Sequence, residues 1–118
     1  MARLGLATLA LMLAAGAALA DGYARVDSRA QFLSLVEGRE LSRFGIALRV
    51  RPDGTIGGNG FGRDVTGSWA WEDGYFCRTL AWPGTDLPRD CQLVELSGST
   101  LRFTAERGRG DTAMLRIR

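Results

Sequence analysis

The stretch Val65–Cys91, VTGSWAWEDGYFCRTLAWPGTDLPRDC, decides the fold of this chain. It begins with a V-x-G-x-W-x-W pattern, which has the two-residue period of a β-strand. The dipeptide Asp73-Gly74 follows, and between two β-rich runs it is typical of a type I′ hairpin turn, because both central residues need a positive φ. The segment therefore predicts a β-hairpin in which Trp71 lies opposite Phe76.

The register of this hairpin sorts its side chains onto two faces, because directly opposed residues share a face. One face carries the aromatic and long apolar side chains and one arginine: Trp69, Trp71, Phe76, Arg78, Leu80 and Trp82. We expect this face to be packed core, with Arg78 at its edge and its guanidinium against the ring of Trp69. The alternative is an aromatic floor for a ligand.

Cys77 and Cys91 are the only cysteines of the chain. In an exported protein such a pair predicts a disulfide, which would stabilise the fold by about 3 kcal/mol by closing a short loop. The spacing is not that of a C-x-x-C redox motif, and two cysteines without histidine do not build a usual zinc site, so no metal is expected. The enclosed segment contains Pro83-Gly84 and Pro88 and predicts a stiff turn held at both ends.

Residues 1–20 have the features of a signal peptide. Arg3 gives a positive start, a run without charge extends from Leu4 to Ala20, and Ala18-Leu19-Ala20 fits the A-x-A cleavage pattern. Cleavage after Ala20 would leave 21–118 as a single disulfide-stapled β-domain. We therefore expect a periplasmic or secreted protein with no membrane span after cleavage. An uncleaved N-terminal anchor is the alternative.

Strand patterns continue on both sides of the hairpin, at Leu41–Arg51, Thr55–Gly57, Cys91–Leu96, Ser99–Glu106 and Thr112–Arg118. In the first of these, the alternation puts Phe44, Ile46, Leu48 and Val50 on one face and Arg43, Arg49 and Arg51 on the other. The glycine-rich stretch Gly57–Arg63 is expected to be a mobile loop between strands.

A short helix is predicted within Asp27–Gly38, where Ser28 and Gln31 resemble a capping box and Gly38 is a suitable stop. It would cover one end of the β-structure. The fold class is therefore mainly β, a small antiparallel barrel or sandwich of about six to seven short strands with one N-terminal helix.

The run GSWAWEDGYFCR at Gly67–Arg78, followed by DCQLV at Asp90–Val94, resembles an uncharacterised group of short exported proteins from alphaproteobacteria with a G-x-W-x-W…C…C pattern. The resemblance spans most of the mature chain and implies export and a disulfide-bonded β-fold, without implying an activity. Similar chains are sometimes labelled dihydrodipicolinate reductase. The residues do not support that label, because the chain has no nucleotide-binding glycine fingerprint at a helix start and neither lysine nor histidine.

Composition disfavours several function classes. The 15 basic residues, all arginine, nearly balance 13 acidic ones, so no nucleic-acid partner is expected. Acid–base and nucleophilic catalysis draw mostly on His, Cys or Lys, which are absent here or engaged in the predicted disulfide. The remaining catalytic option is a carboxylate pair, and the close pairs are Asp53 with Asp64, Glu72 with Asp73, and Asp86 with Asp90. Because carboxylates at turns are usually caps, we expect no enzyme and no cofactor.

Two binding hypotheses remain, both for an expected monomer. In the first, a non-catalytic binding or accessory module holds a small apolar molecule at a barrel mouth through Phe61 and Trp82, with Arg78 as a charged contact. In the second, a secreted inhibitor or envelope-assembly factor binds a protein through the Cys77–Cys91 loop, whose contact residues would be Asp86 and Leu87. A carboxylate-based enzyme is the third alternative.

Overall fold

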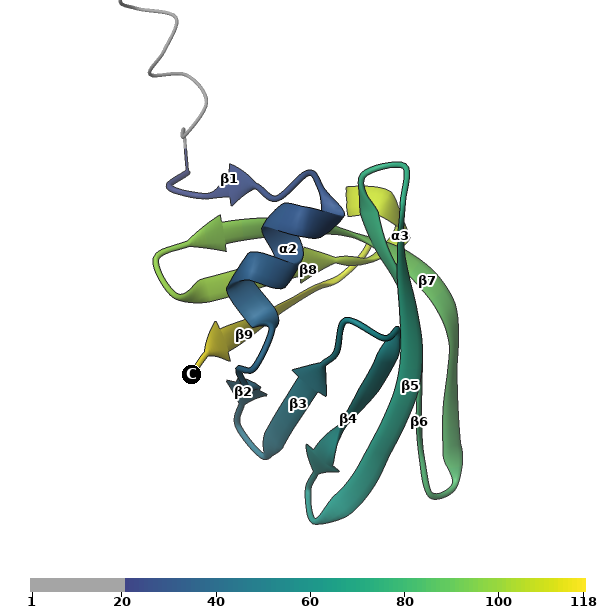
Figure 1. Cartoon of the computed structure of the whole chain (residues 1–118). Helices are drawn as coiled ribbons and strands as arrows, with labels where there is room; N and C mark the ends of the chain where they lie inside the picture. The colour runs from purple at the N-terminus through teal and green to yellow at the C-terminus, as the bar shows by residue number, and fades with distance from the viewer. Residues whose placement is uncertain (1–20) are drawn as a thin grey trace, which may run out of the picture.

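The computed structural model describes residues 21–118, and the predicted signal peptide at 1–20 lies outside the described residues (Figure 1). The elements are β1 (Ala24–Arg25), α2 (Arg29–Val36), β2 (Leu41–Arg43), β3 (Ile46–Val50), β4 (Thr55–Gly60), β5 (Arg63–Glu72), β6 (Tyr75–Trp82), β7 (Thr85–Ser97), β8 (Thr100–Thr104), α3 (Ala105–Gly108) and β9 (Thr112–Ile117). Within this part of the chain, neither helix is long and apolar enough to cross a membrane.

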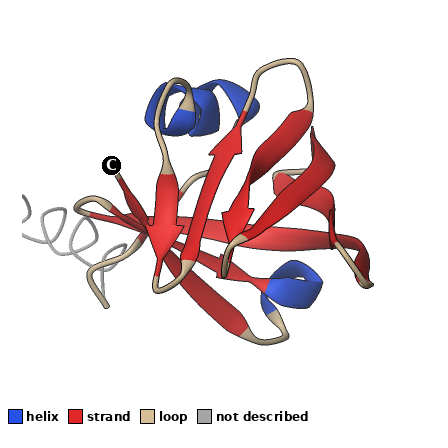
Figure 2. Cartoon of the chain, turned by 90° about the horizontal axis from the view of Figure 1, so that it is seen from below, coloured by secondary structure: helices blue, strands red, loops and turns tan. Residues whose placement is uncertain are grey.

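The strands form one antiparallel sheet that closes on itself. From β2 to β9 each strand pairs with the next along the chain, and β2 pairs with β9, so these eight strands make a closed up-and-down barrel. The two-residue β1 adds to the edge of β7. Figure 2 shows the strands from below, with the two helices lying apart from one another. The predicted fold class is confirmed, with more strands than the six to seven expected.

The central hairpin has the predicted register. Asp73 and Gly74 form the turn with φ of 53° and 85°, and Trp71 lies opposite Phe76. The predicted disulfide is also present and joins Cys77 of β6 to Cys91 of β7 across the strand pair, with the two Cα atoms 3.9 Å apart. The segment between the cysteines is therefore not a free loop, because its residues are the paired ends of two strands.

Helix α2 begins and ends close to the predicted positions. The Ser28 hydroxyl accepts a hydrogen bond from the Gln31 backbone N–H at 3.1 Å, and the Gln31 side chain accepts one from Asp27 N–H. Gly38 follows the helix with a φ of 74°, as a C-terminal glycine does. The one-turn helix α3 was not predicted, because its residues follow a strand pattern directly.

The core lies under α2. Phe32 is completely buried, and its ring centroid lies 5.0–6.4 Å from the rings of Trp69, Trp71, Phe76 and Phe103. These four rings come from β5, β6 and β8, so one helical side chain joins three strands of the barrel wall. The helix thus closes this end of the barrel, as the sequence predicts.

The segment Leu41–Arg51 is not one strand, contrary to the prediction. It folds back at Phe44-Gly45, where Gly45 has a φ of 76°, and Arg43 pairs with Ile46. The ring of Phe44 is therefore 90% exposed instead of facing the core. Arg43 shares the inward face of Ile46, the opposite of its predicted side, because the fold-back resets the alternation.

The glycine-rich stretch was also predicted wrongly. It forms most of strand β4, and only Phe61-Gly62 turns. A Cβ atom on Gly58 would lie 2.1 Å from the carbonyl oxygen of Ala47 on β3, so glycine allows the two backbones to approach closely here. Glycine is generally depleted in strands, which is why the composition favoured a loop.

Candidate functional site

The two ends of the barrel differ in structure. The aromatic core and α2 fill one end. At the other end the chain reverses in three tight turns, Phe44-Gly45, Phe61-Gly62 and Pro83-Gly84. In Figure 1 the last two of these turns lie at the bottom, whereas α2 and α3 both lie in the upper part. We call the end with the three turns the mouth.

A hollow of about 440 Å³ opens at the mouth. Its wall is mainly apolar and includes Ile46, Leu48, Val65, Leu80, Trp82 and Leu87. A second hollow of about 220 Å³ shares Ile46, Leu48, Leu80 and Leu87 with the first and continues to Phe76 and Phe103 of the core. The two hollows therefore adjoin, and together they make up the space in the open half of the barrel. The outer hollow alone is in the size range that proteins use for small molecules, about 300–1,000 Å³.

The charged side chains around this space all have the same sign. Arg63 lines the outer hollow, and Arg43 and Arg78 line the inner one, while no carboxylate lines either. Among residues 21–118 none of these three arginines has an acidic partner within 4.0 Å. The space is thus apolar with positive charge and no negative charge on its wall.

Arg78 is the half-buried member of the three. It lies on the inward face of β6, opposite Trp69 and between Phe76 and Leu80. One guanidinium nitrogen, Nη1, donates a hydrogen bond to the carbonyl oxygen of Pro88 at 3.2 Å. Burial lowers the pKa of Arg78 from its ordinary value, and the negative charge of Asp90 on β7 opposes this shift.

The predicted contact of Arg78 with the Trp69 ring is not formed. Instead, the guanidinium of Arg29 on α2 lies 5.2 Å from the centroid of that ring. The carboxylate of Asp90 is also engaged elsewhere, because one oxygen accepts from the Glu106 backbone N–H at 3.1 Å and the other from the Gln92 side chain at 3.3 Å. Arg78 therefore keeps donor groups without a charged acceptor.

The structure distributes the predicted site residues over different places. Phe61 and Trp82 both lie at the mouth, where Phe61 is 69% exposed and Trp82 is half-buried. Leu87 points into the space, opposite Leu80, whereas Asp86 is exposed on the outer face. Asp86 and Leu87, predicted as one contact surface of a loop, are therefore on opposite faces of a strand.

Sequence reasoning missed Arg43 and Arg63 as site residues. Arg63 follows the same alternation as Val65 and Trp69, so its place on the inward face was readable from the pattern of β5. For Arg43 no such signal exists, because its side depends on the turn at Phe44-Gly45.

Several of the carboxylates considered for catalysis have structural partners. Asp53 accepts hydrogen bonds from the backbone N–H and the hydroxyl of Thr55, and these bonds hold the pKa of Asp53 below its usual value. Glu72 forms an ion pair with Arg89. Residues 21–118 contain no group of three or more His, Cys, Asp or Glu side chains able to hold a metal ion.

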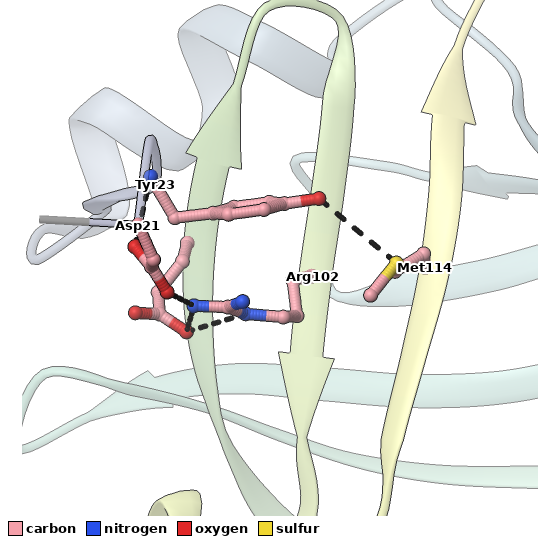
Figure 3. A network of polar contacts seen from close by, with 5 residues as sticks. Asp21, Tyr23, Arg102 and Met114 are labelled. Carbon is pink, nitrogen blue, oxygen red and sulfur yellow. Dashed lines mark hydrogen bonds and ion pairs between the residues drawn. The ribbon is translucent and has the colours of Figure 1, made fainter. Parts of the chain in front are cut away.

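A polar network on the outside of the barrel fixes the first described residues (Figure 3). Arg102 bonds to Asp21 and to Glu95, both at 2.9 Å, and its guanidinium lies 3.9 Å from the centroid of the Tyr23 ring. The Tyr23 hydroxyl reaches the sulfur of Met114 at 3.9 Å. Hydrogen bonding to Arg102 lowers the pKa of Asp21, and the same bond raises the pKa of Arg102. These charges hold the chain in place and are separate from the barrel interior.

Comparisons with known proteins do not assign the chain to a family. The sequence matches no protein-family model, and neither the curated proteins nor the solved structures contain a match. Inference about function therefore starts from the hollow barrel and its chemistry.

Proposed function

We propose that this protein is a non-catalytic binding module of the cell envelope, periplasmic or secreted, that holds a small, mainly apolar molecule in the open half of its barrel. The observation that carries the proposal is the apolar hollow of about 440 Å³ below the core, with a second hollow of about 220 Å³ adjoining it. Protein interiors are normally packed to the density of organic crystals, and an unfilled hollow loses contacts on every wall. A hollow of this size is best explained by a molecule that fills it.

The construction of the wall supports the same proposal. The strands are closed into a barrel, α2 anchors one end, and the disulfide between Cys77 and Cys91 fixes the register of β6 against β7 beside the hollow. A wall held in this way loses little conformational freedom when a ligand enters, which favours affinity. Export, predicted from residues 1–20, would also provide the oxidising environment in which such a disulfide persists.

The first experiment is native mass spectrometry of protein purified gently from the periplasm, followed by titration with the neutral apolar fluorophore N-phenyl-1-naphthylamine. We expect an additional mass of small-molecule size or saturable binding of the fluorophore. Leu87→Trp should abolish both, because it fills the hollow. Asp86→Trp is the matched control on the outer face of the same strand and should bind normally.

Equal binding by both variants would overturn the proposal, because the hollow would then not be the site. Circular dichroism shows whether each variant is folded. If Leu87→Trp does not fold, Leu48→Trp blocks the hollow from the facing wall and tests the same point.

A second candidate is an inhibitor or envelope-assembly factor that binds a protein through the β6–β7 hairpin. The exposure of Asp86, Pro88 and Arg89 on this hairpin favours it. Under this alternative Asp86→Arg would prevent the capture of the partner and leave fluorophore binding unchanged. Under the cavity proposal the same variant has no effect on either measurement.

A further inference from the structure

We propose that the molecule held in the barrel is a single-chain alkyl carboxylate, with its carboxylate on the guanidinium of Arg78 and its alkyl chain directed toward the mouth. This inference rests on the proposed function and adds the chemical class of the ligand. It follows from the charge around the hollow, from the free donors of Arg78 and from the shape of the apolar wall.

The charge argument is that the wall carries cations without anions. Three arginines line the space, and no carboxylate does. A cation removed from water is unfavourable unless an opposite charge or hydrogen-bond acceptors compensate for it. At the half-buried Arg78, the Pro88 carbonyl and the negative charge of Asp90, its register partner on β7, supply part of that compensation, and an anionic ligand would supply the rest.

The geometry of the Arg78 guanidinium favours a carboxylate as the headgroup of the ligand. Nη1 of Arg78 donates to the Pro88 carbonyl at 3.2 Å, and the oxygens of Asp90 each hold another donor. The remaining N–H groups of the planar guanidinium suit a small planar acceptor, and a carboxylate matches this arrangement in a bidentate pair.

The apolar wall of the hollow favours a ligand with a single alkyl chain. Along β6 the inward positions between Arg78 and the mouth are Leu80 and Trp82, with Leu87 facing Leu80 from β7. Four residues of strand separate Arg78 from Trp82, about 13 Å at the usual rise, which a chain of roughly ten carbons spans. Arg63 at the outer hollow and Arg43 at the inner one are both exposed, unlike Arg78, so they raise the local concentration of anions without holding the headgroup, because water screens them.

The test compares three probes with the same chain, decanoate, decan-1-ol and decyltrimethylammonium, by isothermal titration calorimetry at neutral pH. We expect the wild-type protein to bind decanoate at least about tenfold more tightly than decan-1-ol, and the ammonium probe most weakly. Arg78→Met should weaken decanoate binding by about ten- to hundredfold, the range of a hydrogen bond to a charged group, and change decan-1-ol binding little. Arg49→Met, on the outer face of β3, is the matched control and should keep the wild-type preference.

The outcomes separate this inference from the proposed function. If decanoate and decan-1-ol bind with equal affinity, the carboxylate assignment is wrong and the cavity function stands. If none of the three probes binds and the fluorophore also fails to bind, both proposals are wrong. A preference for decanoate that survives Arg78→Met places the headgroup elsewhere and also overturns the inference. Arg78→Gln, which keeps polar character, repeats the test if the methionine variant does not fold.

Discussion

Replacing Phe32 by alanine should remove a large part of the stability of this domain. Phe32 lies on α2, is completely buried, and contacts four aromatic rings with centroid distances of 5.0–6.4 Å. The helix has only eight residues, too few to be stable in water without packing. Phe32 therefore contributes its own burial and also holds α2 on the end of the barrel.

The magnitude follows from comparable substitutions. A buried Phe→Ala change lowers the free energy of unfolding by about 3–5 kcal/mol. Since domains have total stabilities of about 5–15 kcal/mol, Phe32→Ala should remove at least about a fifth of the total, and most of it if the domain lies at the low end of that range. At about 4–8 °C per kcal/mol for a domain of this size, the midpoint of thermal unfolding should fall by about 12–40 °C.

The assay is urea unfolding followed by circular dichroism, with Phe44→Ala as the matched control. Phe44 carries the same ring but is 90% exposed, so its replacement should change the free energy of unfolding by less than about 0.5 kcal/mol. A loss below about 1 kcal/mol for Phe32→Ala would refute the reasoning. It would show that the barrel is stable without the contacts of its helix.

Three further predictions concern other parts of the fold. Replacing Cys77 and Cys91 together by alanine should lower the free energy of unfolding by about 3 kcal/mol in a urea titration, as the loop-closure model gives for this separation. The hydrogen bond from Arg102 lowers the pKa of Asp21 in the folded protein, so the ionised Asp21 side chain stabilises the fold. This stabilisation is fully present above the unfolded pKa of about 3.9 and is lost as the pH falls through the folded pKa. The stability of Asp21→Asn should accordingly lie below wild type at pH 6 and meet it near pH 2, and two parallel curves would contradict this. Gly58→Ala should destabilise the fold by more than about 1 kcal/mol in the same assay, since its φ is 146° and its Cβ would meet a backbone carbonyl at 2.1 Å.

Local sequence signals were sufficient for the features that depend on neighbouring residues. The Asp73-Gly74 turn, the faces of the hairpin around it and the cap of α2 at Ser28 all have the predicted form. Each depends on the backbone preferences of a few adjacent residues, such as the tolerance of Asp-Gly for positive φ. The disulfide was predicted instead from the presence of two cysteines in an exported chain, and the structure places Cys77 and Cys91 opposite each other on paired strands.

The errors arose where long-range pairing overrides local preference. Gly45 looks like an interior residue of an alternating strand, but it turns the chain because β2 must reach β9 to close the barrel. Glycines of β4 resemble a loop, but the close approach of β3 requires them, as Gly58 shows. Neither requirement is visible until the strand partners are known.

The hollow at the mouth was predicted only in outline for the same reason. Phe61 and Trp82 were expected at a barrel mouth because each stands beside a glycine or proline, and both are there. The volume of the space, and the inward side of Arg43, depend on the closure of the whole ring of strands. No single segment contains that information.

The distribution of burial explains how such a small domain can keep an open hollow. Among residues 21–118 the fully buried apolar side chains are Val26, Phe32, Val36, Leu41, Cys77, Val94 and Leu101, and none of them lines the outer hollow. Stability is thus concentrated in the half that α2 covers, while β6 and β7 extend beyond it as a hairpin clamped by the disulfide. Because most of the packing energy does not depend on the open half, the wall at Leu48 of β3 and the wall at Leu80 and Leu87 of the β6–β7 hairpin can remain apart. A substitution that fills the hollow, such as Leu87→Trp, should therefore abolish binding of the fluorophore and leave the free energy of unfolding unchanged. That result would show that binding depends on the open half and stability on the half that α2 covers.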